Sequence, residues 1–458
     1  MRAWSPEQIA DAAGADLLKP LTAAWDAGGP SRVVIDSRIV APGDLFVGLV
    51  GEQVDGGRFA SGALGAGAWG VLVTADHAYE AQCAMPGGDQ ILLAAPDPLL
   101  ALGHLATAWR QALGCPVIGI TGSVGKTTTK DVLAAMLASA GIVVVASAGN
   151  HNTEIGLPLS VLGAPAGTQA LVLEMGMRGA GQIAQLAAIA QPDVAVITAL
   201  GPVHLQQLGS MEAIAAEKAA LVMALDSGAG TAVLPAGEAL LASHHRDDVT
   251  TVTFGPAGSG ADVTPGDLEG LGLDGESAHL RIDACAALAA ARAVGVAPVG
   301  PLAVTLSQMR GQRLTLAGAV TVIDDSYNAS PVSMRAALDD LAARAPAGRG
   351  RLVAVLGDMR ELGPDELRHH AQVGAHARAV GVQLLIAVGP LSGAAYGGEH
   401  VAPDAAAAAA LVPGLLRQGD SVLVKASRGV GLEAVTAALR AAEAATLPDA
   451  EAAKLPDA

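Results

Sequence analysis

Residues 116–131 read Pro-Val-Ile-Gly-Ile-Thr-Gly-Ser-Val-Gly-Lys-Thr-Thr-Thr-Lys-Asp. The apolar run 117–120 predicts a buried parallel strand, and apolar residues at helical spacing in 132–137 predict a helix after the loop. A glycine loop between a strand and a helix forms a phosphate cradle, because its N–H groups and the positive helix end point at the anion. Lys126 adds a positive charge, and we expect the Thr127 hydroxyl to sit on Mg²⁺.

The loop departs from the general phosphate-loop pattern, because Ile120 stands where that pattern has its first glycine. The first loop glycine is Gly122. A glycine-rich turn before an ordinary helix is the alternative interpretation, and the strand, the lysine and the three threonines speak against it. We therefore expect the phosphates of a bound nucleotide, such as ATP, to contact a continuous run of residues. These are Thr121, Gly122, Ser123, Val124, Gly125, Lys126, Thr127 and Thr128.

The composition limits the class of protein. A chain of 458 residues predicts about three domains at ~150 residues each. Its net charge of −17 argues against nucleic acid or anionic lipid as a partner. Three scattered cysteines predict neither a disulfide framework nor a zinc site. The start has no apolar signal-peptide core, and no run approaches the ~20 apolar residues of a membrane span. We expect a soluble cytoplasmic monomer that does not insert into membranes.

Residues 1–108 predict a small α/β domain, with a helix that starts at Ser5-Pro6. A Pro-Gly-Asp turn leads into a strand near residues 45–49, which a second polar turn follows. Asp36, Ser37 and Arg38 could bind a sugar or a phosphate. On spacing alone, two surface turns around one buried strand are the preferred interpretation.

Residues 109–310 carry the cradle and further strands at 142–146, 170–173 and 193–198. Polar residues follow these strands, and ligands bind at the carboxyl ends of parallel strands. Those residues are Asn152, Glu174 and His204. A carboxylate that faces a bound nucleotide commonly holds its metal, so we favour Glu174 as a metal ligand over a simple loop contact.

A helix predicted from Met211 to about Leu225 carries Lys218 among apolar neighbours. Such a lysine needs a partner or a changed charge state, although a solvated face is the ordinary interpretation. Residues 226–283 carry little signal, and His244-His245 predicts a loop rather than a metal site. Helical patterns return at 284–294 and 302–309.

Residues 311–445 predict a third unit with strands at 320–325, 351–356, 384–388 and 421–424. Strand–helix alternation predicts a parallel sheet with right-handed crossovers. Polar clusters follow three of the strands, and their repetition at one edge indicates a binding surface, although each alone could be a cap or a turn. The tail, 446–458, repeats Leu-Pro-Asp-Ala and is predicted to be disordered.

Several stretches together resemble the Mur ligase family over nearly the whole chain. They are Asp36-Ser-Arg38 with Pro42-Gly-Asp-Leu-Phe46, the Thr-Gly-x-x-Gly-Lys-Thr cradle, Gly149-Asn-His-Asn152, Glu174-Met-Gly176, Asp324-Asp-Ser-Tyr-Asn-Ala329 and Leu356-Gly-Asp-Met359. The resemblance implies three α/β domains. They are a UDP-substrate domain (1–108), a central phosphate-loop ATPase domain (109–310) and a Rossmann-like C-terminal domain that binds the incoming dipeptide (311–445).

The resemblance also implies roles for single residues. Catalysis would depend on Lys126, Glu174, His204 and Lys218, and the metal would be held by Thr127, Glu174, His204 and a carbamylated Lys218. Arg313 and Asp325 would touch ATP from the third domain. Asp36, Ser37, Arg38, Asn150 and Asn152 would bind the UDP-substrate. Asn328, Asp358, Lys425, Ser427 and Arg428 would face the dipeptide.

The implied reaction is the ATP- and Mg²⁺-dependent joining of D-Ala-D-Ala to UDP-N-acetylmuramoyl-tripeptide through an acyl phosphate, in peptidoglycan precursor synthesis. Another amino-acid ligase of the same architecture, such as a folylpolyglutamate-type enzyme, is the second hypothesis. A non-catalytic nucleotide-binding relative is the third. The chain departs from the family pattern at a few positions. These are Gly57, Ala220, Ile282-Asp283, Gln312 and Ser330.

Overall fold

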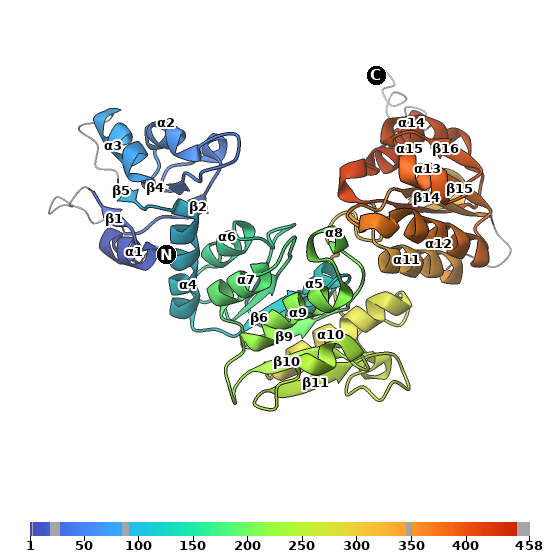
Figure 1. Cartoon of the computed structure of the whole chain (residues 1–458), viewed down its shortest axis with the longest axis horizontal. Coiled ribbons are helices and arrows are strands. Elements are labelled where there is room, and N and C mark those ends of the chain that lie inside the picture. Colours follow the sequence, from blue (N-terminus) through green and yellow to red (C-terminus); the bar gives the residue numbers. More distant parts are fainter. Residues whose placement is uncertain (2, 19–27, 85–90, 345–349, 447–458) are drawn as a thin grey trace, which may run out of the picture.

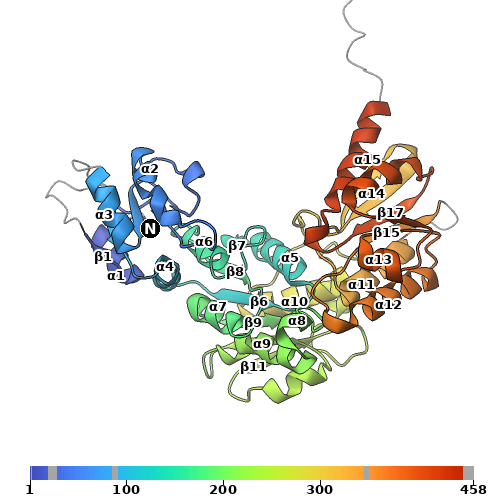
Figure 2. The ribbon, with the colours of Figure 1, turned by 45° about the horizontal axis from the view of Figure 1, so that its top comes forward.

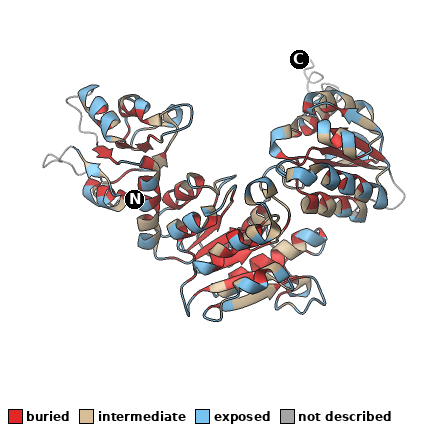
Figure 3. Cartoon of the chain, in the orientation of Figure 1, coloured by how far each residue is buried: buried red, intermediate tan, exposed pale blue. Residues whose placement is uncertain are grey.

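The computed structural model describes residues 1, 3–18, 28–84, 91–344 and 350–446. Three α/β units follow one another along the chain, each built on one sheet. In both views of the ribbon the first and third units lie on opposite sides of the middle unit (Figures 1 and 2). The sheets form the buried interior of each unit (Figure 3). The predicted three-domain α/β architecture is therefore confirmed. The predicted tail lies almost wholly outside the described residues.

The first unit has a five-stranded sheet in which only the short edge strand β1 runs antiparallel. Its helix α1 begins as predicted, because the Ser5 hydroxyl accepts a hydrogen bond from the Gln8 N–H and Pro6 occupies the first turn. The strands in sheet order are β1 (Asp16–Leu17), β5 (Ile91–Ala94), β4 (Gly70–Val73), β3 (Leu45–Val47) and β2 (Val33–Val34). The helices are α1 (Pro6–Ala13), α2 (Ala60–Gly65) and α3 (Ala75–Ala84).

The middle unit has a six-stranded sheet whose strands all run parallel. Both of its faces are covered, which explains the unbroken apolar runs in the sequence. On β6, Val117 belongs to the core on one face and Ile118 to the core on the other. The sheet order is β11 (Thr250–Phe254), β10 (Thr231–Pro235), β9 (Val194–Ile197), β6 (Val117–Thr121), β8 (Ala170–Glu174) and β7 (Val144–Ala146). The helices are α5 (Lys126–Ser139), α6 (Gly156–Leu162), α7 (Gln182–Ala190), α8 (Leu205–Leu208), α9 (Met211–Met223) and α10 (Ala278–Ala293).

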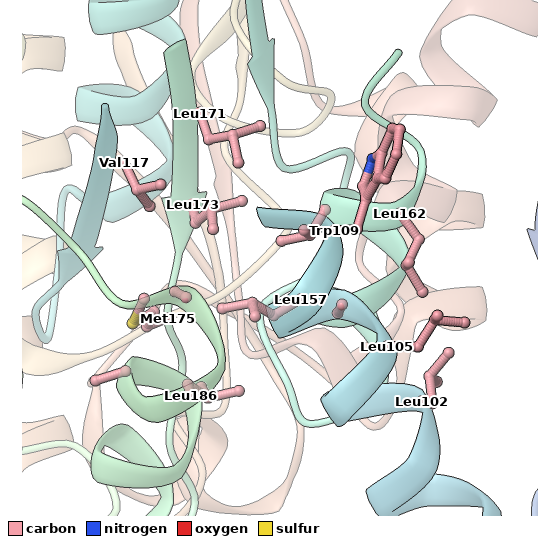
Figure 4. Packing of buried hydrophobic residues seen from close by; sticks show 14 of the residues in the cluster. Leu102, Leu105, Trp109, Val117, Leu157, Leu162, Leu171, Leu173, Met175 and Leu186 are labelled. Carbon is pink, nitrogen blue, oxygen red and sulfur yellow. The ribbon is translucent and has the colours of Figure 1, made fainter. Parts of the chain in front are cut away.

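Helix α4 (Pro98–Leu113) joins the first two units into one hydrophobic core. Its buried side chains meet residues of the first sheet, such as Leu93, and residues of the middle unit, such as Leu157. In Figure 4 the α4 side chains lie beside Leu157 and Leu162 of α6. The indole of Trp109 donates a hydrogen bond to the Ala164 carbonyl at 2.9 Å. The predicted domain boundary at residues 108 and 109 therefore falls inside a continuous helix.

The third unit has a six-stranded sheet in which β12 alone runs antiparallel to its neighbour. Its order is β12 (Gln312–Leu316), β13 (Val320–Asp324), β17 (Ser421–Lys425), β14 (Leu352–Gly357), β15 (Leu384–Val388) and β16 (His400–Ala402). The helices are α11 (Pro331–Arg344), α12 (Glu366–Ala379), α13 (Pro390–Ala395), α14 (Ala405–Leu411) and α15 (Glu433–Thr446). None of the helices in the described part of the chain is long and apolar enough to cross a membrane.

One predicted element is wrong. Residues 302–309 form an extended segment and a turn rather than a helix. Leu302, Val304 and Leu306 pack against the second core of the middle unit, while Ala303 and Thr305 are exposed. This alternation has the two-residue period of an extended chain, which is difficult to separate from a helical pattern in so short a run. In the weakly informative stretch 226–283, the structure contains β10 and β11.

Candidate active site

The glycine loop between β6 and α5 is held from behind by the segment that follows β9. The Ser123 N–H donates to the Ala199 carbonyl at 2.8 Å, and the Ser123 hydroxyl donates to the Gly201 carbonyl at 3.0 Å. Gly122 has φ +154°, and a Cβ there would lie 1.9 Å from the Thr198 hydroxyl oxygen. Gly125 has φ +86°, which favours glycine. The backbone of the loop is therefore fixed in a shape that side chains would disrupt.

Lys126 begins α5, and its Nζ donates to the Gly122 carbonyl at 2.8 Å, across the loop. Burial lowers the pKa of the Lys126 ammonium, while the nearby Glu174 carboxylate favours the charged form. The buried Thr121 hydroxyl oxygen has no hydrogen-bond partner within the described residues. A phosphate cradle needs these features, namely loop N–H groups, a fixed cation and unpaired polar atoms.

Thr127, Glu174 and Asn152 form a hydrogen-bonded row beside the loop. The Thr127 hydroxyl donates to one Glu174 oxygen at 2.7 Å, and the Asn152 amide donates to the other at 2.9 Å. Glu174 is buried at the end of β8, next to β6 in the sheet. The oxygens of Thr127 and Glu174 are hard ligands of the kind that suits Mg²⁺. This ion takes few protein ligands beside phosphates and water. No group of three His, Cys, Asp or Glu side chains in the described residues forms a complete metal site alone.

His204 and Lys218 are further predicted residues of the middle unit. His204 precedes α8 in a left-handed conformation (φ +55°), and its Nδ1 is hydrogen-bonded to Glu361 of the third unit. Burial lowers the His204 pKa, which Glu361 opposes and the charges of Lys126 and Lys218 reinforce. Lys126, His204 and Lys218, three of the predicted catalytic residues, therefore lie within electrostatic reach of one another.

Lys218 is buried on α9, and its Nζ has one hydrogen-bonding contact, the Met177 sulfur at 3.8 Å. Within the described residues no carboxylate pairs with it. Its neighbour Glu217 instead accepts from the Gly181 and Ile183 N–H groups at the start of α7. Burial and the charge of Lys126 lower the pKa of the Lys218 amine well below its usual value.

The predicted UDP-substrate residues are divided between two places. Asp36, Ser37 and Arg38 follow β2, and the Arg38 guanidinium contacts the Asp36 carboxylate at 2.7 Å. This hydrogen bond lowers the Asp36 pKa to about 2. In the middle unit Asn152 joins Glu174, while Asn150 is exposed.

His77 lies beside Gly57, a position where the chain departs from the family pattern. A Cβ at Gly57 would lie 2.3 Å from Cδ2 of His77, so His77 occupies the space beside this glycine. Its Nε2 contacts the Asp55 carboxylate at 2.9 Å, and its Nδ1 contacts Glu80 at 2.9 Å. His77 was not among the predicted residues, because the contact joins positions 22 residues apart.

The polar residues of the third unit gather at the carboxyl ends of β13, β14 and β17. The Lys425 ammonium pairs with the Asp325 carboxylate and donates to the Asn328 carbonyl at 2.9 Å. The Ser427 N–H donates to the Asp358 carbonyl at 3.1 Å. The remaining two predicted residues, Arg313 and Arg428, pair with carboxylates, and Arg428 also lies 5.7 Å from the centre of the Tyr327 ring. Arg313 contacts Asp340 at 3.5 Å and Arg428 contacts Glu433 at 3.1 Å.

Two unpredicted contacts border the site. The Asp283 carboxylate lies against the loop, because a Cβ at Gly125 would be 2.2 Å from its Oδ1, and burial raises the Asp283 pKa. The Arg310 guanidinium carbon lies 3.9 Å from the centre of the Tyr327 ring. The sequence marked residue 283 only as a departure from the family pattern, and it gave no signal for Arg310.

Family models match three parts of the chain. They are the "Mur ligase family, catalytic domain" over residues 31–111, the "Mur ligase middle domain" over 120–278 and the "Mur ligase, glutamate ligase domain" over 309–428. A Synechocystis protein named UDP-N-acetylmuramoyl-tripeptide--D-alanyl-D-alanine ligase is 37% identical over 90% of this chain and 92% of its own. The crystal structure of MurF from Acinetobacter baumannii has a TM-score of 0.82 at 27% identity and covers 95% of this chain and 98% of its own. MurF from Thermotoga maritima in complex with ADP has a TM-score of 0.78 at 27% identity and covers 91% of this chain and 98% of its own.

Proposed function

Since this chain belongs to the Mur ligase family, we propose that it joins D-alanyl-D-alanine to UDP-N-acetylmuramoyl-tripeptide at the expense of ATP. The observation that carries the proposal is the phosphate cradle, with Lys126 across the loop and the Thr127–Glu174 pair beside it. The name of the Synechocystis relative supports the tripeptide and dipeptide substrates, and the ADP bound to the Thermotoga relative supports the nucleotide. The cytoplasmic location and the monomeric state stay predictions.

The chemistry explains why ATP is needed. A carboxylate resists attack by an amine, because the leaving group would be oxide. In the proposed first step a carboxylate oxygen of the tripeptide bonds to the γ-phosphorus, the bond from that phosphorus to the β-bridging oxygen breaks, and ADP leaves. In the second step the dipeptide amine bonds to the acyl carbon, inorganic phosphate leaves, and the amine gives up a proton. Lys126 stabilises the charge on the transferring phosphoryl group.

We propose Mg²⁺ as the cofactor, since the oxygens of Thr127 and Glu174 fit this ion. When bound, the ion neutralises charge on the nucleotide phosphates. From the family resemblance, His204 would hold the magnesium ion together with Thr127 and Glu174, and a carbamylated Lys218 would support a second Mg²⁺. An unpaired, neutral Lys218 amine can bond to the carbon of CO₂ and release a proton, which yields a carbamate with metal-binding oxygens.

The two other substrates are assigned to the flanking units. Asp36, Ser37, Arg38, Asn150 and Asn152 would bind the UDP-substrate. Asn328, Asp358, Lys425, Ser427 and Arg428 would face the dipeptide, and Arg313 and Asp325 the nucleotide. Because these groups come from three units, the units must close around the acyl phosphate, which also keeps water from it.

The test is phosphate release from the purified full chain with Mg-ATP, UDP-N-acetylmuramoyl-tripeptide and D-Ala-D-Ala. We expect sustained release and the amide product only when both acceptors are present. Sustained release without the dipeptide counts against the proposal. Turnover with a free amino acid or a folate substrate in its place supports the alternative ligases, and ATP binding without any product supports a non-catalytic relative.

A further inference from the structure

His77 is a histidine of the first unit that the proposed reaction does not use. It lies half-buried in the first turn of α3, just beyond the carboxyl end of β4. Both of its ring nitrogens contact carboxylates, since Nε2 lies 2.9 Å from Asp55 and Nδ1 lies 2.9 Å from Glu80. A neutral imidazole has one donor and one acceptor, so it can satisfy only one of two ionised carboxylates. The arrangement therefore requires an imidazolium, which donates through both nitrogens.

Asp55 lies at the base of a hairpin formed by residues 48–57, which follows β3. The tip of this hairpin is exposed. At its base the two ends touch, because a Cβ at Gly48 would lie 2.7 Å from Cα of Gly57. Asp55 accepts a hydrogen bond from the Gly57 N–H at 2.9 Å through Oδ1 and contacts His77 through Oδ2. His77 therefore fastens the base of the hairpin to α3.

The hairpin shares one edge of the first sheet with residues that are proposed to bind the UDP-substrate. Strands β2, β3 and β4 run parallel, so residues 36–38, the hairpin and His77 follow them at the same carboxyl edge. Helix α2 contacts both the 3₁₀ turn η1 (Ser37–Ile39) and the 3₁₀ turn η2 (Gly56–Phe59) at the end of the hairpin. Ligands of open α/β sheets bind beyond this edge. The placement of the hairpin therefore shapes the surface that a substrate meets.

The charges around His77 determine the pH range in which it is an imidazolium. The Glu80 and Asp55 carboxylates raise the pKa of His77 above its ordinary value of about 6.5, and burial opposes them. Arg58 of η2 favours the ionised form of Asp55, and Asp76 of α3 is exposed. Helix α2 and strands β4 and β5 also pack on α3, and they carry no charged side chain. As the pH rises through the His77 pKa, the ring loses a proton and one carboxylate loses its hydrogen bond.

We propose that the imidazolium of His77 clamps the 48–57 hairpin to α3 and so positions the hairpin for the UDP-substrate. This inference rests on the proposed function and deepens it, because it adds a positioning residue to the substrate edge of the first unit. His77 acts through Asp55 and does not itself need to touch the substrate. The UDP-substrate should therefore bind most tightly where His77 is protonated and less tightly once the ring is neutral.

The test measures the affinity of the full chain for UDP-N-acetylmuramoyl-tripeptide by calorimetry from pH 6 to pH 9. His77→Gln and Glu80→Gln are compared with wild type as the ratio of the two Kd values at each pH, which cancels the titration of the substrate itself. His376→Gln is the matched control, since His376 of α12 contacts Asp339 at 2.7 Å in the third unit. An NMR titration gives the pKa of His77, whose ring signal is the one that His77→Gln lacks. Thermal denaturation verifies that each variant is folded, and amide formation is measured in parallel.

We expect His77→Gln to weaken binding about three- to tenfold at pH 6 and less than about twofold at pH 9. The Kd ratio should fall across the pH range in which His77 titrates. Glu80→Gln should move the NMR midpoint and the affinity midpoint to lower pH together, because Glu80 contributes most to the raised pKa of His77. His376→Gln should bind like wild type at every pH.

A Kd ratio for His77→Gln that stays constant from pH 6 to pH 9 overturns the inference, because a merely structural role would not depend on the proton. A Glu80→Gln midpoint that shifts by NMR but not in affinity overturns it as well. The expected affinity profile without amide formation rejects the proposed function alone, whereas amide formation with a constant Kd ratio rejects only the role of His77. Absence of any binding of the UDP-substrate rejects both.

Discussion

At the scale of single residues, Lys218 is an amine buried against a thioether, and within the described residues no carboxylate forms an ion pair with it. The pKa of Lys218 in the folded chain is well below its value in the unfolded chain. At a pH between these two values, the unfolded chain therefore binds more protons than the folded chain. The free energy of unfolding should therefore rise with pH across that window and level off above the unfolded pKa of about 10.4.

We predict that Lys218→Met raises the free energy of unfolding by ~1–3 kcal/mol near pH 7, because it removes a buried polar group without a good partner. The gain should shrink as pH rises toward 10, and ligation should be lost. Denaturant unfolding in CO₂-free buffer measures the gain and its pH dependence, and amide formation measures ligation. Lys130 is the matched control, a buried lysine that contacts Asp131 at 2.7 Å and donates to the Ser147 carbonyl. Lys130→Met should destabilise the chain, and a pH-independent gain for Lys218→Met would refute the argument.

At the scale of elements, α4 connects the first and middle units more firmly than a linker could. Trp109 packs edge-on against Trp4 at 5.3 Å between ring centroids and hydrogen-bonds the middle unit through Ala164. Its removal would leave a cavity between the two units, and a cavity adds to the lost transfer free energy. The two units are expected to unfold together in the wild-type chain, because they share one core.

We predict that Trp109→Ala costs about 3–5 kcal/mol and separates the unfolding of the first unit from that of the middle unit. Differential scanning calorimetry should then resolve an additional transition. Leu100→Ala on the same helix is the control, because Leu100 is 61% exposed and should change little. A single unshifted transition in Trp109→Ala would show that α4 does not couple the units.

At the scale of the whole molecule, the contact between the middle and third units includes the His204–Glu361 hydrogen bond. His204 is also a proposed metal residue, and the Glu361 contact uses only Nδ1, so the imidazole can join a metal at Nε2 to the third unit. The arrangement of the third unit should therefore depend on Glu361. Domain closure in ligases of this kind is expected to follow the nucleotide and its metal.

We predict that Glu361→Ala increases the radius of gyration of the ligand-free chain, because it removes one of the contacts between these units. Small-angle scattering measures the change, and Mg-AMPPNP should reduce the difference from wild type. Asp365→Ala is the control, since Asp365 pairs with Arg368 within the third unit at 2.8 Å. Identical scattering curves for Glu361→Ala and wild type would mean that this hydrogen bond does not hold the units together.

The sequence by itself determined the features that depend on near neighbours. The glycine loop, its lysine and the strands with two buried faces are local patterns, because backbone conformation and burial repeat over a few residues. The family resemblance added the roles of the three units and the reaction. The same kind of local pattern led to a wrong prediction of a helix at residues 302–309, because so short an apolar run fits both the helical and the extended period.

Only the tertiary structure decided which distant side chains meet. Asp283 lies against Gly125, His204 is bonded to Glu361, and Arg310 lies on Tyr327. These contacts join different elements, and in one case different units, so no spacing along the chain encodes them. They depend on where the packing of helices and strands places the ends of these elements and the side chains found there. The phosphate loop of the active site is therefore built from adjacent residues, whereas the charged residues around it come from distant parts of the sequence.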